Sequence, residues 1–238
     1  MARTAVTNRF RVRDFGTALS FDGVDDYVSR TELTGLNAAS SISLFVKAFS
    51  TTGTRALVSN IVSSSNRVAV VMAGSGAVSG GYYNGTSYVG KSSTDTRVDD
   101  KQWHHIVFTW DGTTSQIYLD GVVQSGTAQP VTQSTAGLRI STDTNGTAPF
   151  AGKIDEPRIW SRALTADEVS ALYYQGTVPT TGLVAEYLFN EGAGTTATDS
   201  SGNGNDGTIT GATYTSDVPS YERTAATGRT AATGRVAV

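Results

Sequence analysis

The sequence Ala18-Leu-Ser-Phe-Asp-Gly-Val-Asp-Asp-Tyr-Val28 has the pattern of a strand, a tight acidic turn and a second strand. Leu19 and Phe21 alternate with smaller residues, which predicts a strand with one apolar face. Asp22-Gly23 supplies a turn in which glycine takes a positive φ, and β-type residues resume after it. We therefore expect a β-hairpin over residues 15–30, against which the other strands pack.

The composition agrees with one large β domain. The chain has 238 residues, of which 26 are glycine, 38% are hydrophobic and 16% are charged. Such values suit many short strands joined by turns of Gly, Ser, Thr and Asn. The net charge is −3, so nothing in the body predicts a nucleic-acid partner.

Cysteine is absent, which excludes a disulfide framework and a thiolate metal site. Residues 1–14 contain no apolar segment of the kind found in a Sec signal peptide, and no apolar run reaches a membrane-spanning length. We expect no membrane insertion, and a protein that stays in the cell or leaves it by a route other than Sec export.

Further strands follow along the chain. In residues 41–49 the hydrophobic side chains Ile42, Leu44, Val46 and Ala48 share one face. Asn84-Gly85 and Asp120-Gly121 are typical turns of two-residue β-hairpins. Pro157 lacks an N–H group, so its strand (residues 151–160) is expected to be an edge strand or to contain a local break.

One helix is predicted. Thr165 and Glu168 have the spacing of a capping box, in which each side chain accepts a backbone N–H of the other residue. Val169, Leu172 and Tyr173 then form an apolar stripe, and Gly176 ends the helix.

Several motifs together resemble one family. They are the opening segment at residues 18–28, Trp103-His-His-Ile-Val-Phe-Thr-Trp-Asp-Gly112, Ile117-Tyr-Leu-Asp-Gly121, and Gly152-Lys-Ile-Asp-Glu-Pro-Arg-Ile-Trp160 leading into the helix. These segments resemble the laminin-G-like, concanavalin-A-like jelly-roll modules. The resemblance implies an all-β, two-sheet antiparallel jelly-roll sandwich with one short helix. It also implies a glycan- or protein-binding module, sometimes with a structural Ca²⁺.

The order of the segments departs from that family. A segment like residues 182–214 usually precedes the Phe-Asp-Gly motif, whereas here it follows the helix. We expect a body over residues 15–214 with its last strands permuted to the C-terminus, closing the same sandwich. The alternative is that these strands complete a neighbouring subunit.

Catalysis is not expected. Related folds include glycoside hydrolases, which place paired carboxylates on one face of a strand. Asp155 and Glu156 are adjacent and would point to opposite faces, and so would the neighbouring histidines, His104 and His105. Core packing is therefore the better interpretation of the histidines.

Two acidic loops have the chemistry of a Ca²⁺ site, because Ca²⁺ prefers carboxylate, amide and carbonyl oxygens on flexible loops. The alternative is ordinary turn chemistry, which uses the same residue types. The candidate metal ligands are Asp22 and Asp25, near Asp26, in one loop, and Asp199, Asn203, Asn205 and Asp206 in the other.

Exposed aromatics and amides in loops could bind a glycan. Tyr82, Tyr83, Asn84 and Tyr88 are the candidates, because an aromatic face stacks on a sugar ring. The rival interpretation is a hairpin stabilised by cross-strand aromatic pairs.

Related basic, Thr-rich arms flank the body at residues 1–14 and 215–238. Their arginines Arg3, Arg9, Arg223, Arg229 and Arg235 are candidate assembly contacts, with copies of the chain or with another particle protein as partner. Two functional hypotheses follow. The first is a non-enzymatic structural, decoration or adhesion protein on a virion or similar particle surface. The second is a carbohydrate-binding module of a bacterial surface or secreted protein.

Overall fold

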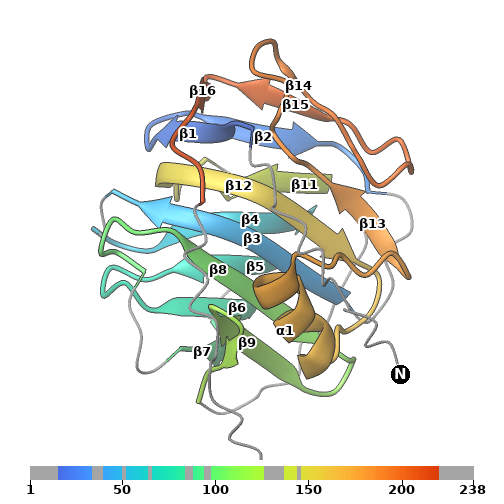
Figure 1. Cartoon of the computed structure of the whole chain (residues 1–238). Coiled ribbons are helices and arrows are strands. Elements are labelled where there is room, and N and C mark those ends of the chain that lie inside the picture. Colours follow the sequence, from blue (N-terminus) through green and yellow to red (C-terminus); the bar gives the residue numbers. More distant parts are fainter. Residues whose placement is uncertain are drawn as a thin grey trace, which may run out of the picture.

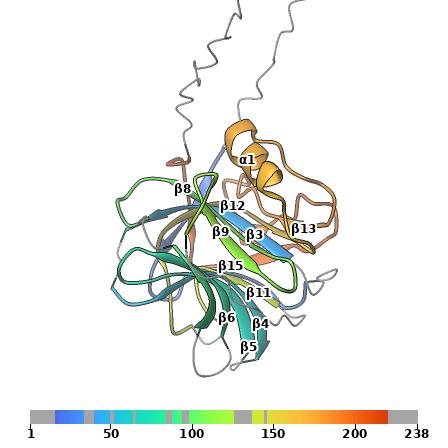
Figure 2. The same ribbon diagram turned by 90° about the horizontal axis from the view of Figure 1, so that it is seen from below.

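The computed structural model describes residues 16–33, 40–49, 52–63, 66–83, 88–93, 98–125, 137–143 and 146–219. Within these ranges two antiparallel sheets pack face to face, and a short helix lies on the outside of one of them (Figures 1 and 2). The predicted all-β jelly-roll sandwich with one helix is confirmed. Both terminal arms lie almost wholly outside the described residues.

The first sheet, here sheet A, contains strands from both ends of the chain. β1 and β3 come from the N-terminal part, β8, β9, β10 and β12 from the middle, and β13 and β16 from the end (Figure 1). The order is β10-β9-β8-β3-β12-β1-β16, and β13 also pairs with β12. The bounds are β1 Ala18–Asp22, β3 Ser40–Ala48, β8 His104–Trp110, β9 Ser115–Leu119, β10 Val122–Val123, β12 Ala151–Trp160, β13 Leu183–Glu186 and β16 Thr213–Thr215.

The second sheet, here sheet B, lies behind sheet A in the view of Figure 1. Its order is β14-β15-β2-β11-β4-β5-β6-β7. The bounds are β2 Tyr27–Arg30, β4 Arg55–Ser63, β5 Asn66–Met72, β6 Val78–Tyr83, β7 Tyr88–Ser92, β11 Gly137–Ile140, β14 Thr196–Ala197 and β15 Gly207–Thr210.

The opening segment is not a hairpin, which corrects the expectation for residues 15–30. β1 pairs with β12 and β16 in sheet A, whereas β2 pairs with β11 and β15 in sheet B. The turn between them therefore carries the chain from one sheet to the other. Asp22 and Asp26 hold this turn, because their carboxylates accept the backbone N–H groups of Val24 and Asp22 at 2.8 Å each. Gly23 has the predicted positive φ, 82°.

The core lies between the two sheets, where the inward faces of their strands meet. The predicted inner face of β3 is confirmed, since Ile42, Leu44, Val46 and Ala48 all belong to the main hydrophobic cluster. Gly80 on β6 lies against the ring of Phe108, where a Cβ would collide with it, so this close approach requires glycine.

The helix α1, Ala166–Gln175, forms as the sequence predicts. Thr165 and Glu168 make the capping box, and Gly176 ends the helix with a left-handed φ of 65°. Val169 and Leu172 are buried and belong to a second hydrophobic cluster on the outer face of sheet A. The helix therefore covers sheet A on the side away from the core (Figure 2).

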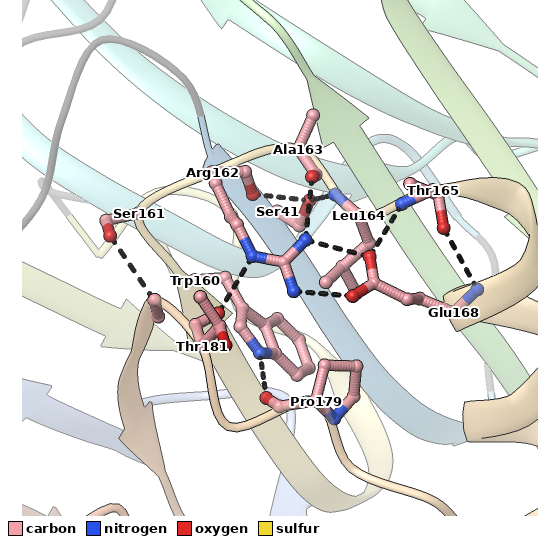
Figure 3. A network of polar contacts seen from close by, with 11 residues as sticks. Ser41, Trp160, Ser161, Arg162, Ala163, Leu164, Thr165, Glu168, Pro179 and Thr181 are labelled. Atoms are coloured by element: carbon pink, nitrogen blue, oxygen red, sulfur yellow. Dashed lines mark hydrogen bonds and ion pairs between the residues drawn. The ribbon is translucent and has the colours of Figure 1, made fainter.

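Polar contacts hold the segments that precede and follow the helix (Figure 3). The guanidinium of Arg162 donates to both carboxylate oxygens of Glu168, at 2.8 and 2.6 Å, and to the carbonyl of Thr181 at 2.8 Å. The indole of Trp160 donates to the carbonyl of Pro179 at 2.7 Å. These bonds tie residues 177–182 to the end of β12.

The last strands close the sandwich of their own chain. β13 pairs with β12, β15 with β2, and β16 with β1. Tyr187 and Phe189, which lie between these strands, are fully buried in the core. This pairing agrees with the favoured intramolecular arrangement, while the permuted order relative to the family stays a prediction.

β12 shows how the chain accommodates Pro157. The strand lies between β3 and β1, so it is not an edge strand. It contains a break in register between Asp155 and Arg158, and Glu156 there has a φ of 46°. The alternative expectation of a local break is therefore confirmed.

Candidate functional site

The candidate site is a pocket at one rim of the sandwich, which we call the rim pocket. Its volume is about 110 Å³, and it is lined by Val24, Asp25, Tyr27, Arg139, Thr142 and Gly146. The first three residues come from the turn between β1 and β2 and from the start of β2. The others come from β11 and the segment after it. β2 and β11 are neighbours in sheet B, with Ser29 opposite Arg139, so both sets meet at the same rim.

Tyr27 and Arg139 form one wall of the rim pocket. The guanidinium carbon of Arg139 lies 4.3 Å from the centroid of the Tyr27 ring, which is the geometry of a cation–π contact. The Nε atom of Arg139 is buried and has no hydrogen-bond partner among the described residues. The contact with Tyr27 therefore positions the guanidinium while one of its buried donors is unused.

Thr142 supplies the second unused polar group. The residue is 2% exposed, and its hydroxyl has no hydrogen-bond partner among the described residues. Its backbone is held firmly, because Ser59 donates to the Thr142 carbonyl at 2.9 Å. A buried polar group without a partner costs about 1–3 kcal/mol. The Thr142 hydroxyl therefore has a hydrogen-bonding capacity that no other described residue uses.

The side chains on either side of Thr142 in the sequence, Ser141 and Asp143, have partners, whereas its own hydroxyl has none among the described residues. Ser141 donates to the carbonyl of Phe150 at 3.2 Å. The carboxylate of Asp143 accepts the backbone N–H of Thr147 at 2.7 Å and the hydroxyl of Thr147 at 2.6 Å. Local hydrogen bonds therefore hold the backbone around Thr142, and none of them uses the Thr142 side chain.

An acidic group borders the rim pocket. Asp22, Asp25 and Asp26 each place one carboxylate oxygen within 4.8 Å of the others, and the described carboxylates and imidazoles form no second group of this kind. Asp22 and Asp25 are exposed and Asp26 is buried against Gly211. Burial raises the pKa of Asp26, and the charges of Asp22 and Asp25 raise it further against the lowering effect of the Asp22 N–H bond.

This acidic group fits a calcium ion in its chemistry. All three ligand candidates are hard oxygens, and backbone N–H bonds already orient the carboxylates of Asp22 and Asp26. Asp22 and Asp25 are the metal ligands predicted from the sequence, and Asp26 of the same loop lies with them. Calcium at this group stays a prediction.

The second predicted metal loop uses its side chains differently. One carboxylate oxygen of Asp199 accepts the N–H groups of Glu186 at 3.0 Å and Ser201 at 2.9 Å, and the other accepts that of Asn205 at 2.9 Å. Asp206 accepts the N–H of Asp199 at 2.8 Å. These acids hold the loop to the body.

The amides of the same loop are also engaged. Asn203 donates to the carbonyls of Leu183 and Val184 at 2.9 and 3.1 Å, and the fully buried Asn205 donates to that of Val184 at 2.8 Å. The loop has the turn chemistry given above as the alternative. A metal at Asp199, Asn203, Asn205 and Asp206 stays a prediction.

The predicted aromatic site falls at the far edge of sheet B. Tyr82 and Tyr83 lie on β6 and Tyr88 on β7, with Tyr83 opposite Tyr88 in the backbone register. Asn84 and the side chains of these tyrosines lie outside the described residues. Glycan binding by this group therefore stays a prediction, as do the assembly contacts of Arg3, Arg9, Arg223, Arg229 and Arg235, which also lie outside.

The acids of β12 are buried in a structural ion cluster. Asp155 is 1% and Glu156 7% exposed. The buried Arg158 donates to Glu156 at 3.0 Å and to Glu186 on β13 at 2.6 Å. Because a partner of opposite charge engages Glu156, this cluster joins β13 to β12 and does not present a pair of acids to a ligand.

The two histidines point to different surroundings, as the strand pattern predicts. His105 is 1% exposed, and its ring lies 5.6 Å from that of Tyr173 and 4.6 Å from that of Phe45. This confirms the packing interpretation for His105 and shows that it is wrong for His104. His104 lies between two carboxylates, with Nδ1 at 2.8 Å from Asp120 and Nε2 at 3.1 Å from Asp100.

Sequence reasoning missed most of the rim pocket. Tyr27, Arg139 and Thr142 carry no motif, and more than a hundred positions separate the first from the others. The register between β2 and β11 brings them together, and this register is not visible in the sequence. Only Asp25 belongs both to the predicted residues and to the pocket lining.

The chain is a two-sheet sandwich with a small pocket at its rim, and polar and aromatic side chains line this pocket. The family model described as the concanavalin A-like lectin/glucanases superfamily matches residues 22–170, more than half of the chain. The chain belongs to this superfamily. The resemblance stated from the motifs is therefore confirmed.

Solved structures show the same fold at low sequence identity. A protein from Bacteroides ovatus that is proposed to bind carbohydrate aligns with a TM-score of 0.66 and 16% identity, over 86% of this chain and 61% of that chain. The heptameric SAP-like pentraxin of Limulus polyphemus aligns with a TM-score of 0.54 and 18% identity, over 67% and 83% of the two chains. The chain thus spans less than two thirds of the Bacteroides protein. No curated protein sequence matches it.

The described residues contain no helix that is long and apolar enough to cross a membrane.

Proposed function

We propose that the chain is a carbohydrate-binding module and that the rim pocket is its ligand site. The observation that carries this proposal is that Thr142, a residue of the pocket lining, has a buried hydroxyl without a partner among the described residues. A sugar hydroxyl both donates and accepts hydrogen bonds, so it satisfies such a group in either direction. The proposed carbohydrate binding of the Bacteroides ovatus protein supports the proposal only at the level of the fold.

The other lining residues suit a sugar in complementary ways. Asp25 accepts and Arg139 donates charge-assisted hydrogen bonds to hydroxyls, and the ring of Tyr27 offers an apolar surface to C–H groups. The pocket of about 110 Å³ is smaller than a drug-sized ligand site, which holds about 300–1,000 Å³. We therefore expect it to take one terminal sugar unit with modest affinity.

A calcium ion is included in the proposal as an aid to binding. Asp22, Asp25 and Asp26 are the residues that would hold it, and Asp25 also lines the pocket. When bound, Ca²⁺ supplies positive charge and open coordination positions for hydroxyl oxygens. The residues of the chain fix the sugar through Thr142, Arg139 and Tyr27.

The proposed function is binding without chemistry. Glu156 and Arg158 engage each other inside the fold, and Asp155 accepts the N–H of Glu156 at 2.8 Å. These groups are therefore poorly suited to act as the acid and base that a glycosidase needs. The particle-protein hypothesis depends on the arms outside the described residues and stays a prediction.

A glycan array followed by calorimetry tests this proposal, with calcium present and with a chelator. We expect wild-type protein to bind a terminal sugar and Thr142→Val to lose at least tenfold in affinity, which corresponds to about 1.4 kcal/mol. The variant should melt at the same or a higher temperature, because valine removes a buried hydroxyl that has no partner. Loss of binding with retained stability would separate a ligand contact from a structural one.

Thr208→Val is the matched control. Thr208 lies exposed on β15, in the same sheet as β11, and the substitution makes the same change of side chain. The control should bind like the wild type. Equal affinity of wild type and Thr142→Val, or no glycan bound by wild type at millimolar concentration, would overturn the proposal.

A further inference from the structure

Two lysines face each other on the outer face of sheet A. Lys47 on β3 lies directly opposite Lys153 on β12 in the antiparallel register. Their neighbours Val46, Ala48 and Ile154 belong to the core between the sheets, so both lysines point away from it. Like charges directly opposite each other destabilise a sheet. This position therefore requires an anion.

Asp217 supplies that anion from the segment after β16. Its carboxylate accepts from Lys47 Nζ at 2.9 and 3.2 Å, from Lys153 Nζ at 2.5 Å and from the indole Nε1 of Trp103 at 3.1 Å. Three donors from three distant parts of the chain thus converge on one carboxylate. We call Lys47, Lys153 and Trp103 the carboxylate cradle.

The cradle binds the charged form of the carboxyl group. Burial alone would raise the pKa of Asp217, but the hydrogen bonds from Lys153, Lys47 and Trp103 lower it to about 2. The side chains of Lys47 and Lys153 are 22% and 14% exposed, so the cradle is shielded yet still open at the surface.

Aromatic groups border the cradle. Trp103, itself a cradle residue, is half-buried. Phe49 lies beside the cradle, because its ring centroid is 5.6 Å from Lys153 Nζ, and it is 44% exposed. A carboxylate-binding group beside aromatic surface matches a sugar acid, which has a carboxylate next to C–H groups. A simple inorganic anion would not use the aromatic part.

We propose that the carboxylate cradle is a second ligand site that binds the carboxylate of an acidic sugar of the hexuronate class, and that Asp217 occupies it when no ligand is bound. The choice of a sugar as ligand rests on the proposed function. The site is separate from the rim pocket, because none of its residues lines that pocket. Asp217 belongs to the same chain, so it competes for the cradle intramolecularly.

Calorimetry with digalacturonate and its neutral counterpart, galactobiose, tests the inference on the full chain. Asp217→Asn removes the competing charge and keeps a side chain of the same shape. We expect this variant to bind digalacturonate on the order of tenfold more tightly than wild type does, with no gain for galactobiose. Adding Lys47→Gln and Lys153→Gln to Asp217→Asn should abolish the gain.

Lys101→Gln combined with Asp217→Asn is the control for net charge. Lys101 is exposed and belongs neither to the cradle nor to the rim pocket, so the gain should persist. A gain that disappears equally with Lys101→Gln would mean nonspecific attraction and would overturn the inference. Equal affinity of wild type and Asp217→Asn for digalacturonate would also overturn it.

A measurement on wild type avoids dependence on the folding of the variants. The indole N–H of Trp103 gives a separate NMR signal, which should move when millimolar digalacturonate displaces Asp217 and stay in place with galactobiose. An unmoved signal contradicts the inference. Binding of neutral glycans that Thr142→Val abolishes would still support the rim pocket, so the two proposals fail independently.

Discussion

The turn between β1 and β2 and the loop at residues 199–206 are both short and acidic, but their polar groups are engaged to different extents. Residues 22–26 contain three aspartates and one glycine, and residues 199–206 contain two aspartates, two asparagines and two glycines. In the loop, Asp199 accepts three backbone N–H groups and Asn205 is buried against Val184. In the turn, Asp22 and Asp26 each accept one backbone N–H group, and Asp22 and Asp25 remain exposed. Thr142, which lines the pocket beside them, has a buried hydroxyl with no partner among the described residues.

The type of residue therefore does not separate a ligand site from a structural loop. A polar group held by several backbone groups contributes to stability and offers little to a ligand, whereas a buried group without a partner costs stability that a ligand can restore. Mutating a group of the first kind should therefore lower the free energy of unfolding, and mutating a group of the second kind should lower the affinity for the ligand.

The largest effect is expected for Asp199→Ala. The substitution leaves the N–H groups of Glu186, Ser201 and Asn205 without their acceptor. We expect a loss of about 3 kcal/mol or more in the free energy of unfolding, measured by urea denaturation. Asp25→Ala should change it by less than about 0.5 kcal/mol, because Asp25 is exposed. Equal losses in the two variants would show that the acids of the turn and of the loop contribute alike to stability.

An intermediate effect is expected for calcium. If the acidic group at Asp22, Asp25 and Asp26 binds the ion, calcium at a hundred times its dissociation constant stabilises the fold by about 2.7 kcal/mol. Thermal unfolding with and without calcium measures this effect. Asp25→Asn should remove the stabilisation, while Asp206→Asn should keep it. The reverse result would assign the ion to the loop at residues 199–206.

The smallest effect is expected at His104, a group whose two ring nitrogens both have carboxylate partners. Burial lowers the pKa of His104, but the hydrogen bonds and charges of Asp120 and Asp100 raise it above 6.5 overall. The folded state therefore holds the proton more tightly than the unfolded state does. This stabilisation is complete below pH 6.5 and is lost as the pH rises through the raised pKa.

Urea denaturation between pH 6 and 9 measures this contribution, which we expect to be under about 1 kcal/mol. His104→Gln should flatten the pH dependence in this range, since it removes the titrating group. A pH dependence that is unchanged in the variant would show that His104 does not cause it.

The sequence predicts the fold well because the fold depends on local patterns. The alternation in β3, the capping box of Thr165 and Glu168, and the C-terminal Gly176 each act within a few residues. The hairpin expected at residues 15–30 is wrong for a physical reason. The partner of a strand depends on the other strands of the fold. β1 pairs with β12 and β2 pairs with β11, so β1 and β2 do not pair with each other.

The site is less accessible to sequence reasoning than the fold. Asp22 and Asp25 are recognisable because acidic turns stand out, but Asp199 and Asn205 stand out equally. Arg139 and Thr142 join Tyr27 only through the register of sheet B. Whether the Thr142 hydroxyl has a partner depends on packing in three dimensions, which no pattern along the chain records.

The most direct test of the account is to map amide chemical shifts by NMR while wild-type protein is titrated with the glycan selected on the array. We predict that the amides of Tyr27, Arg139 and Thr142 shift together with one dissociation constant, and that those of residues 199–206 stay in place. Shifts confined to residues 199–206, or to the edge formed by β6 and β7, would contradict the rim pocket as the ligand site.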